Sequence, residues 1–305
     1  MLRELMERIG LGSRKFYVVD VFAERKYAGN QLAVVTDAGD ITGREMQLIA
    51  REMNYSETAF ILSGDPRNGG YDVRIFTQVE EVPFAGHPTL GTAYVIQQEI
   101  IKELIEILYL NLKIGKIPVR FKYKESQPEI LWMNQNQPEF GHMFDPVLIS
   151  ESLNLGPRDI DERYPIQEVS TGLPFIIVPL KKLEALKNSK VKRDIFFQVI
   201  RDTRAKAVLL FCPETYSLEN DLNVRVYVDY YGIPEDPATG SGNGCLAAYL
   251  AKYRYFGDDH VDIRVEQGCE IGRPSLLYLR AISNGTTIDV DVGGKVMMVA
   301  KGELC

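Results

Sequence analysis

The sequence predicts a protein of mixed helices and strands that folds as two similar lobes. Two glycine-dense segments, 84–93 and 236–245, each follow a strand-like run and open a helix. The strand-like pieces that precede each segment also recur in the same order. The 305 residues, 45% of them hydrophobic and 25% charged, suffice for two hydrophobic cores of ordinary size.

The recurring pieces indicate an internal duplication. In the first half, a turn and strand at Gly29–Val35 and a strand at Arg74–Thr77 precede the first glycine segment. In the second half, Gly172–Val178 and Arg225–Val228 stand in the same order before the second segment. The intervals between matching pieces differ by several residues, and strand and turn residues recur in any protein of this class, so the repeat is a weak one.

The polar stretch Glu125–Glu129 is the predicted crossing between the lobes. The first lobe is therefore predicted over residues 1–126 and the second over residues 127–305, with the last strand returning to the first lobe. Residues 1–14 form an extension, for which a short docking helix is the only assignment that the sequence suggests. The extension lacks the long apolar core of a signal peptide, and no later run reaches transmembrane length.

The first lobe opens with a buried strand at Phe16–Phe22. A helix is predicted from Thr42, because Thr42 can cap its N-terminus, Glu45 stands three residues on, and apolar residues follow at helical spacing. Asn54–Ser56 ends this helix, and the extended run Glu57–Leu62 follows it.

The glycine segments set the positions of the remaining elements. After the first segment, a buried helix is predicted through Thr92 to about Leu108, and Ile117–Tyr123 alternates as an exposed strand would. The second lobe is predicted to contain a polar helical stretch at 183–198, strands at 207–212 and 223–228, a buried helix near 242–253, and strand-like runs at 261–266, 275–282 and 287–300.

Charge and cysteine content restrict the class of partner. The formal net charge is -7 and the basic residues are dispersed, which argues against nucleic acid and favours a small ligand. The four cysteines form no C-x-x-C pair and no zinc-site spacing. We therefore expect reduced thiols in a cytoplasmic protein and no metal site.

Both glycine segments are candidate anion sites. A helix start leaves backbone N–H groups unpaired and carries a partial positive charge, and glycine lets a ligand approach that backbone closely. Each segment is therefore able to hold a carboxylate.

Three side chains near these features are candidates for chemistry. Glu57 is followed by an apolar run, where burial would raise the pKa of its carboxyl and suit a proton shuttle, although a strand start paired to a local amide explains it as well. His87 can bind a ligand or transfer a proton near neutral pH, or simply cap a helix. Asp236 can orient a ligand amine or hydroxyl, or form an ordinary Asp-Pro turn before a helix.

Taken together, these segments resemble the phenazine-biosynthesis PhzF-like proteins. The resemblance covers the chain from about Phe16 onward and is densest between Asp20 and Ala93. It rests on Asp20–Phe22, Gly29–Asn30, Met46–Gln47, Ile49–Asn54, Ser56–Thr58, Arg74–Thr77, Phe84–Ala93 and Asp236–Ser241. Gln78 departs from the pattern, since a proline is expected after Arg74–Thr77, and this change concerns a turn more than the chemistry.

The resemblance implies the diaminopimelate epimerase fold. That fold has two pseudo-symmetric lobes, each a curved, mostly antiparallel, barrel-like sheet around a central helix, with the active site in the cleft between them. It also implies a homodimer, since the family often forms dimers. Gln267 and Arg273 lie in stretches that again resemble the family, and either reach the site or form a turn between the last strands.

The resemblance further implies an isomerase that needs no cofactor and no metal. Glu57 would be the general acid and base, moving a proton between carbons of a small carboxylic acid. His87 and Asp236 would bind or polarise the substrate. Backbone N–H groups around Gly86, and around Gly240 and Ser241, would contact it.

Two other functions stay open on the residues alone. One is a cofactor-independent amino-acid racemase or epimerase that uses Glu57 and another group, such as His87, on opposite faces. The other is a non-catalytic protein that binds a small carboxylate. A racemase with a thiol from each lobe is disfavoured, because the first glycine segment has no cysteine and Cys245 lies a helical turn inside the second, where we predict a core residue.

Overall fold

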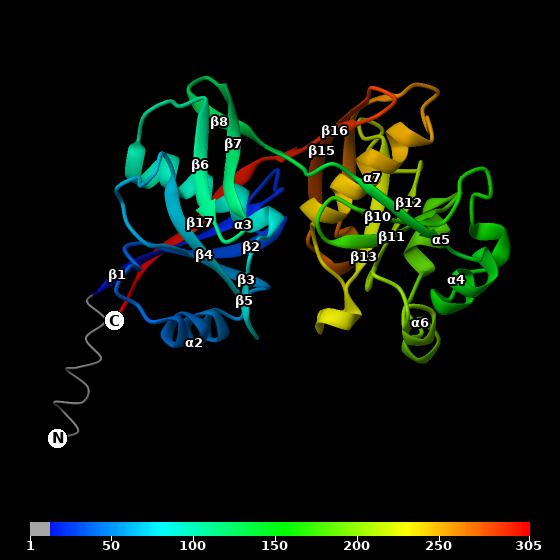
Figure 1. Cartoon of the computed structure of the whole chain (residues 1–305), viewed down its shortest axis with the longest axis horizontal. Coiled ribbons are helices and arrows are strands. Elements are labelled where there is room, and N and C mark those ends of the chain that lie inside the picture. Colours follow the sequence, from blue (N-terminus) through cyan, green and yellow to red (C-terminus); the bar gives the residue numbers. More distant parts are fainter. Residues whose placement is uncertain (1–12) are drawn as a thin grey trace. The chain divides into compact units, whose positions relative to one another are not determined.

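The computed structural model describes residues 13–305, which form two compact units (Figure 1). Unit 1 contains the described residues up to Val21, Gln31–Leu131 and Val296–Cys305. Unit 2 contains Phe22–Asn30 and Trp132–Lys295. The docking helix suggested for the N-terminal extension falls outside the described residues, apart from the last two positions of that extension.

The crossing between the units nearest to the predicted one lies inside a strand and not in a linker. Glu125 and Ser126 have φ angles of 51° and 62° and form a tight turn between β7 (Gly115–Lys124) and β8 (Gln127–Asn134). The division falls between Leu131 and Trp132, within β8. The predicted crossing at 125–129 is therefore wrong, because that polar stretch is a hairpin turn.

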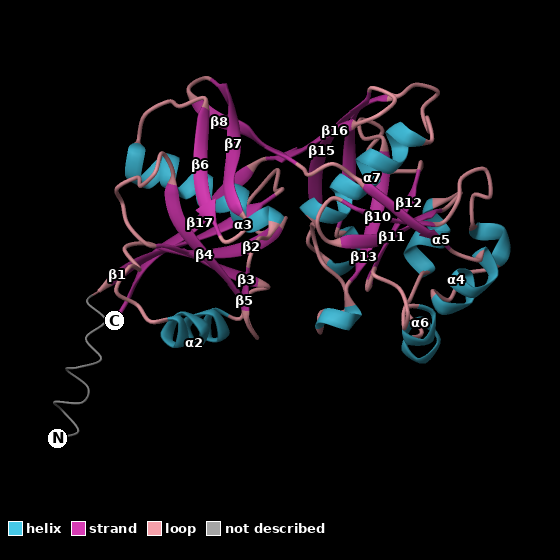
Figure 2. Cartoon of the chain, viewed as in Figure 1, coloured by secondary structure: helices cyan, strands magenta, loops and turns pink. Residues whose placement is uncertain are grey.

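Unit 1 is a curved sheet wrapped around one helix (Figure 2). β1 pairs antiparallel with β17, β2 parallel with β3, β3 antiparallel with β4, β4 parallel with β6, and β6 antiparallel with β7. Besides β7 and β8, the strands are β1 (Arg14–Val21), β2 (Asn30–Val35), β3 (Glu57–Ile61), β4 (Tyr71–Thr77), β5 (Glu81–Val82), β6 (Ile107–Leu112) and β17 (Val296–Leu304).

The central helix of unit 1 is α3 (Gly86–Val95), which contacts β1, β3, β6, β7 and β17. Nearly all of its residues are buried, as expected of a helix that is apolar all round. Gly91 allows this close packing, because a Cβ atom there would lie 2.6 Å from Leu32 Cδ2 and 2.9 Å from Val21 Cγ2.

The helix predicted to reach about Leu108 ends earlier. A π-helical turn at Ile96–Ile101 follows α3 and stops at Lys102, which has a φ angle of 61°. Leu108 instead belongs to β6, where buried and exposed residues alternate and Tyr71 of β4 pairs with Leu110. The apolar residues of this stretch follow the period of a strand, and β6 pairs with β7 directly after it as well as with the more distant β4.

The outer helix of unit 1, α2 (Gly43–Met53), forms as predicted. Thr42 Oγ1 accepts from the Glu45 N–H, and the Glu45 side chain accepts from the Thr42 N–H at 2.8 Å, which completes a capping box. Asn54 ends the helix in the left-handed region. Met46 and Ala50 bury the inner face of the helix against β3 and β4.

Unit 2 repeats the plan around α7 (Gly240–Lys252), which contacts β10, β11, β14, β15 and β16. Its sheet runs from β9 and β10 through β16, and β16 also pairs with β8. The strands are β9 (Glu139–Met143), β10 (Gln167–Ser170), β11 (Pro174–Pro179), β12 (Ala207–Cys212), β13 (Leu222–Tyr227), β14 (His260–Gln267), β15 (Ser275–Ser283) and β16 (Ile288–Gly294).

Three short helices of unit 2 share a second hydrophobic core with β11 and β12. They are α4 (Pro146–Ser152), α5 (Leu183–Asn188) and α6 (Arg193–Val199). The single helix predicted at 183–198 is therefore two helices, and the strand-like run predicted at 287–300 is divided between β16 and β17.

The strand order confirms the mixed fold and supports the duplication. From β2 to β7 the pairings run parallel, antiparallel, parallel and antiparallel, and from β11 to β15 they run in the same sequence. Arg74 pairs with Phe60, which pairs with Val35. In unit 2, Arg225 pairs with Leu210, which pairs with Val178. The register therefore makes Arg74 equivalent to Arg225, as the sequence repeat proposed.

Candidate active site

Glu57 is the first residue of β3. It pairs with Leu32 of the parallel neighbour and with Thr77 of the antiparallel one, so both adjacent strands fix its position. The residues that follow it in β3 are fully buried, and its own side chain is 19% exposed. A carboxyl group held at the edge of a core in this way is able to meet a ligand.

His87 lies beside Glu57. It is the second residue of α3, and its Nε2 is 3.4 Å from Glu57 Oε2. Burial lowers the pKa of His87 to about 3, against a weaker raising effect of a hydrogen bond to the backbone of Gln31. The contact therefore joins a carboxyl group to a neutral imidazole and is not an ion pair. Its length exceeds that of an ordinary hydrogen bond.

The start of α3 provides backbone donors next to these side chains. Ala85 precedes the helix and makes no side-chain cap, and the first turn contains no acidic residue. Gly86 is buried at the first helical position. The first N–H groups of α3 thus keep the capacity to bind an anion.

Asp236, in unit 2, is a buried carboxyl group held by two neutral donors. Asn30 Nδ2 donates to its Oδ1 at 2.9 Å, and Thr239 Oγ1 donates to its Oδ2 at 2.5 Å. Burial raises the pKa of Asp236 to about 6, the two hydrogen bonds oppose this, and the charge of Glu235 adds a small upward effect. A perturbed buried acid of this kind is typical of functional sites.

The start of α7 follows directly. Thr239 precedes Gly240 and Ser241, and it makes no side-chain cap to this helix. Gln267 is fully buried and reaches this segment, with its Oε1 accepting from the Thr239 N–H at 3.2 Å. Arg273 instead donates to the carbonyls of Ala28 and Gly29. Gln267 therefore contacts the start of α7, and Arg273 contacts the backbone just before Asn30.

Asn30 and Thr239 both donate to Asp236, a role that the sequence did not predict for either residue. Both stand inside motifs that carried the resemblance, yet neither residue type is diagnostic of a site. The sequence does hint at the position of Asn30, because Gly29 precedes it. Gly29 has a φ angle of 67° and turns the chain so that Asn30 can donate to Asp236.

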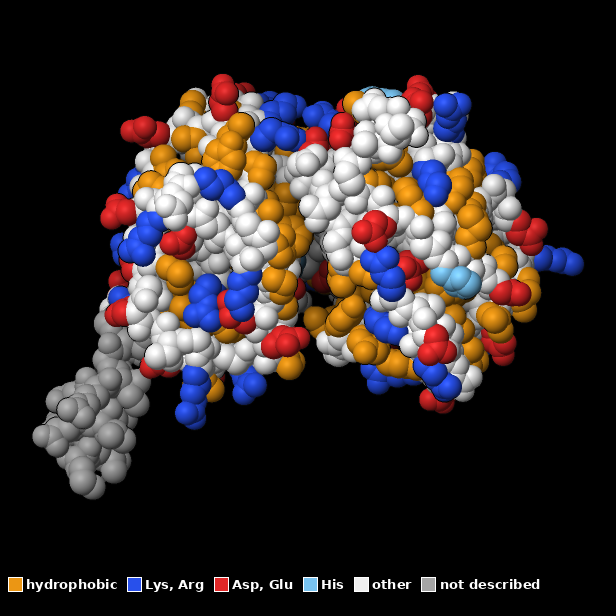
Figure 3. Space-filling model, in the orientation of Figure 1, with side chains coloured by type: hydrophobic (Ala, Val, Ile, Leu, Met, Phe, Trp, Pro, Cys, Tyr) orange, Lys and Arg blue, Asp and Glu red, His pale blue; other side chains and the backbone are white. Residues whose placement is uncertain are grey.

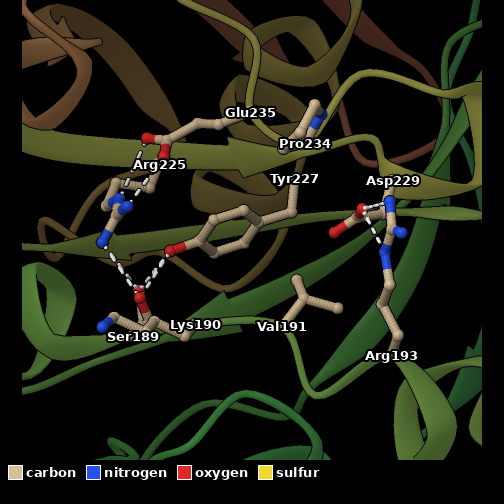
Figure 4. Close-up of a pocket in the computed structure, with 9 residues that line it drawn as sticks. All are labelled: Ser189, Lys190, Val191, Arg193, Arg225, Tyr227, Asp229, Pro234 and Glu235. Atoms are coloured by element: carbon tan, nitrogen blue, oxygen red, sulfur yellow. Dashed lines mark hydrogen bonds and ion pairs between the residues drawn. The ribbon is translucent and has the colours of Figure 1, made fainter.

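A cavity of about 430 Å³ lies beside the loop that carries Glu235 (Figure 4). Arg225 lines it and donates through Nε and Nη2 to Glu235 at 2.9 and 2.7 Å, and Arg193, drawn on the other side in Figure 4, pairs with Asp229. Tyr227 donates to the Ser189 carbonyl at 2.8 Å. Because these polar groups bind one another, we assign the cluster a structural role.

The same pair of residues recurs in unit 1. Arg74 donates through Nε and Nη2 to Glu81 at 2.9 and 2.8 Å, which lowers the pKa of Glu81 to about 2. Glu81 and Glu235 each precede a glycine segment. Both copies of the duplicated unit therefore have an arginine–glutamate pair just before the central helix begins.

The candidate residues Glu57 and His87, in contrast, have no counterpart of the same type in unit 2. Phe175 pairs with Ala207 as Leu32 pairs with Glu57, so Ala207 takes the position of Glu57 in unit 2. Ser241 stands second in α7, as His87 does in α3. Cys245 is buried against Thr171, and burial raises the pKa of its thiol to about 12. This agrees with its prediction as a core residue.

One protein family matches nearly the whole chain. The PhzC-PhzF family, described as phenazine biosynthesis-like protein, matches residues 19–302. The chain belongs to the PhzC-PhzF family. The resemblance seen in the sequence is thereby confirmed, and the family's named relatives are isomerases.

Two relatives illustrate the match to the PhzC-PhzF family. The trans-2,3-dihydro-3-hydroxyanthranilate isomerase of Pseudomonas aeruginosa is 34% identical over 291 residues, which cover 94% of this chain and 98% of the relative. An uncharacterised isomerase of Clostridium acetobutylicum is 31% identical over 294 residues, covering 94% and 97%. The chain is thus an enzyme of an isomerase family.

Solved structures agree on the fold. The PhzF-family phenazine biosynthesis protein of Bacillus anthracis superposes with a TM-score of 0.88 at 28% identity, covering 97% of this chain and all of the other. A hydroxyproline epimerase of Agrobacterium vitis shares the fold alone, with a TM-score of 0.62 at 8% identity. The predicted epimerase-like architecture is confirmed.

The surface carries charges of both signs. Figure 3 shows lysine and arginine side chains scattered among acidic ones on the face drawn.

Within residues 13–305, no helix is long and apolar enough to span a membrane. The same residues contain no group of three or more His, Cys, Asp or Glu side chains placed to hold a metal ion.

Proposed function

We propose that this chain is an isomerase that moves a proton between two carbons of a small unsaturated carboxylic acid, with Glu57 as the single acid and base. The observation that carries the proposal is the Glu57–His87 contact in unit 1 together with its absence from the duplicated position, where Ala207 and Ser241 stand. One proton-transfer group suits removal and return of a proton on one face. A two-base racemase needs a second one.

The proposed reaction has two proton transfers. Glu57 as carboxylate takes a proton from a carbon, and the electron pair of that C–H bond enters the adjoining unsaturated system. Glu57, now a carboxylic acid, returns the proton to another carbon, which leaves the double bond displaced and the atoms unchanged in number. Hydrogen bonds from a preorganised site and a desolvated base suffice to activate such a carbon acid, so the step uses no cofactor.

The other site residues are proposed to bind the substrate. Backbone N–H groups at Gly86, and at Gly240 and Ser241, suit a carboxylate because both helices begin without a side-chain cap. Neutral His87 would hydrogen-bond the substrate or Glu57. Asp236 would accept from an amine or hydroxyl group. The named Pseudomonas aeruginosa relative acts on a dihydro-hydroxyanthranilate, so a cyclic amino or hydroxy acid is the substrate class that we propose. A cytoplasmic homodimer is the expected setting.

Proton NMR in deuterium oxide tests this function directly. The purified protein is incubated with a panel of unsaturated cyclic and amino carboxylic acids, beside Glu57→Gln and the control Glu52→Gln, which changes an exposed residue of α2. We expect deuterium on carbon and a displaced double bond with the native protein and the control, and neither with Glu57→Gln.

The alternatives give different results. Exchange with inverted configuration and no displaced double bond would favour a racemase. Carboxylate binding without exchange would favour a binding protein. Full turnover by Glu57→Gln would overturn the assignment of the base.

A further inference from the structure

We propose that Gln267 acts as a positioning residue that keeps Asp236 in its ionised, hydrogen-bond-accepting form, through the hydroxyl group of Thr239. This deepens the proposed function and rests on it, since Asp236 is there the acceptor of a substrate amine or hydroxyl.

The orientation of the Gln267 amide is set by its partners. Its oxygen accepts from the backbone N–H of Thr239 at 3.2 Å and from Asn243 Nδ2 at 2.8 Å. Its nitrogen donates to the carbonyl of Asp236 at 2.8 Å and to Thr239 Oγ1 at 3.0 Å. A backbone N–H can only donate and a carbonyl can only accept, so the amide has one satisfactory orientation.

That orientation fixes the direction of the next hydrogen bond. A threonine hydroxyl has a single proton. Because Gln267 donates to Thr239 Oγ1, the hydroxyl directs its own proton to Asp236 Oδ2 at 2.5 Å. Gln267, Thr239 and Asp236 thus form a one-way chain of donors that ends on a carboxylate.

The second oxygen of Asp236 also faces a donor. Asn30 Nδ2 donates to Oδ1 at 2.9 Å and to the Ala238 carbonyl at 3.0 Å, which sets the orientation of the Asn30 amide as well. A protonated Asp236 would place its proton against one of these two donors. Both contacts therefore favour the ionised form.

These contacts work against burial and one negative neighbour. Burial is the largest effect on the Asp236 carboxyl and raises its pKa, and the charge of Glu235 acts in the same direction. Arg225 binds Glu235 in a two-pronged ion pair (Figure 4), while Arg273 is directed to the Gly29 carbonyl. The donor chain from Gln267 and the hydrogen bond from Asn30 are thus the two neutral interactions that oppose protonation of Asp236.

The decisive variant is Gln267→Met. Methionine has nearly the length of glutamine but cannot donate and cannot titrate, so the direction of the Thr239 hydroxyl is no longer fixed by a neighbouring donor. We expect the titration midpoint of Asp236 to rise by about half a pH unit or more, because its hydrogen bond from Thr239 is weakened. Thr239→Val should raise it through loss of the donor alone, whereas Thr239→Ser, which retains the hydroxyl, should leave it near the native value.

The readout is carboxyl ¹³C NMR of protein labelled on aspartate, between pH 4 and 8, with Asp236→Asn to assign the signal. Gln167→Met is the matched control, because Gln167 is buried in the same unit but contacts Gly141 and Tyr253. An unchanged Asp236 midpoint in folded Thr239→Val would overturn the proposal. So would equal shifts in Thr239→Val and Thr239→Ser.

The catalytic consequence is measured separately. In the native enzyme and the Thr239 variants, the acid limb of the pH profile of kcat/KM should follow the Asp236 midpoint found by NMR. If Glu57→Gln retained full turnover, the proposed function would fail while the NMR shifts still decided the role of Gln267. If the midpoints moved and the profile did not, Asp236 would have no part in substrate binding, and the functional half of the inference would be wrong.

Discussion

Asn30 and Asp236 are joined side chain to side chain, although 206 positions separate them in the sequence. The contact lies within unit 2, because the early segment Phe22–Asn30 belongs to that unit. Arg273 anchors the same segment through the Ala28 and Gly29 carbonyls. A motif near the start of the chain therefore supports an acidic residue near its end.

The buried Asp236 carboxyl should make stability depend on pH. Its pKa is raised to about 6 from 3.8, so the folded state binds the proton more tightly and loses relative stability as pH rises through this window. Asp236→Asn removes that cost. We expect the free energy of unfolding of the variant, relative to the native protein, to increase by up to about 3 kcal/mol between pH 4 and 7. Denaturant unfolding across that range measures it, and a difference independent of pH would contradict the prediction.

His87 should remain neutral throughout the working range of pH. Burial lowers its pKa to about 3 from 6.5, so the unfolded state binds the proton more tightly between these values. The contribution of His87 to stability is therefore present above pH 6.5 and is lost as pH falls toward 3. The imidazole NMR signals that disappear in His87→Gln should stay constant from pH 8 to 5, and a midpoint near 6.5 would show that the side chain is solvated.

Glu57→Gln should lower kcat by about 10³-fold, within the range expected for loss of a general acid and base. KM should change little, because glutamine retains the size of the side chain and its capacity for hydrogen bonds. Steady-state kinetics with a substrate found in the NMR panel measures both constants. A rise in KM with kcat preserved would instead assign Glu57 to binding.

The two arginine–glutamate pairs should differ in energetic weight. Arg225 and Glu235 have side chains only 10% and 8% exposed, against 31% and 15% for Arg74 and Glu81. Removing one partner of a buried pair leaves an uncompensated charge, at a cost of about 3 to 5 kcal/mol. We expect that loss for Glu235→Gln and a smaller one for Glu81→Gln. Equal losses in thermal or denaturant unfolding would contradict the role of burial.

Much of the architecture follows from local sequence. The capping box at Thr42 and Glu45 determines where α2 begins, since both partners lie within one turn. The glycine segments predict the two buried helix starts, and the recurring strands predict the duplication. Glu57, His87 and Asp236 stand in motifs that can be recognised one at a time.

Contacts between positions far apart in the sequence are set by the tertiary fold. The helix predicted to reach about Leu108 stops at Lys102, and Ile107 and Leu108 belong to β6, which pairs with β7 and with the more distant β4. The register of β3 placed Glu57 beside His87 and gave Ala207 the equivalent position in unit 2. Asn30 and Gln267 found their roles around Asp236 in the same way. Short-range patterns determine helix caps, turns and periodicity. Strand register and burial depend on contacts between distant segments, and the sequence of one segment does not show which other segment it will contact.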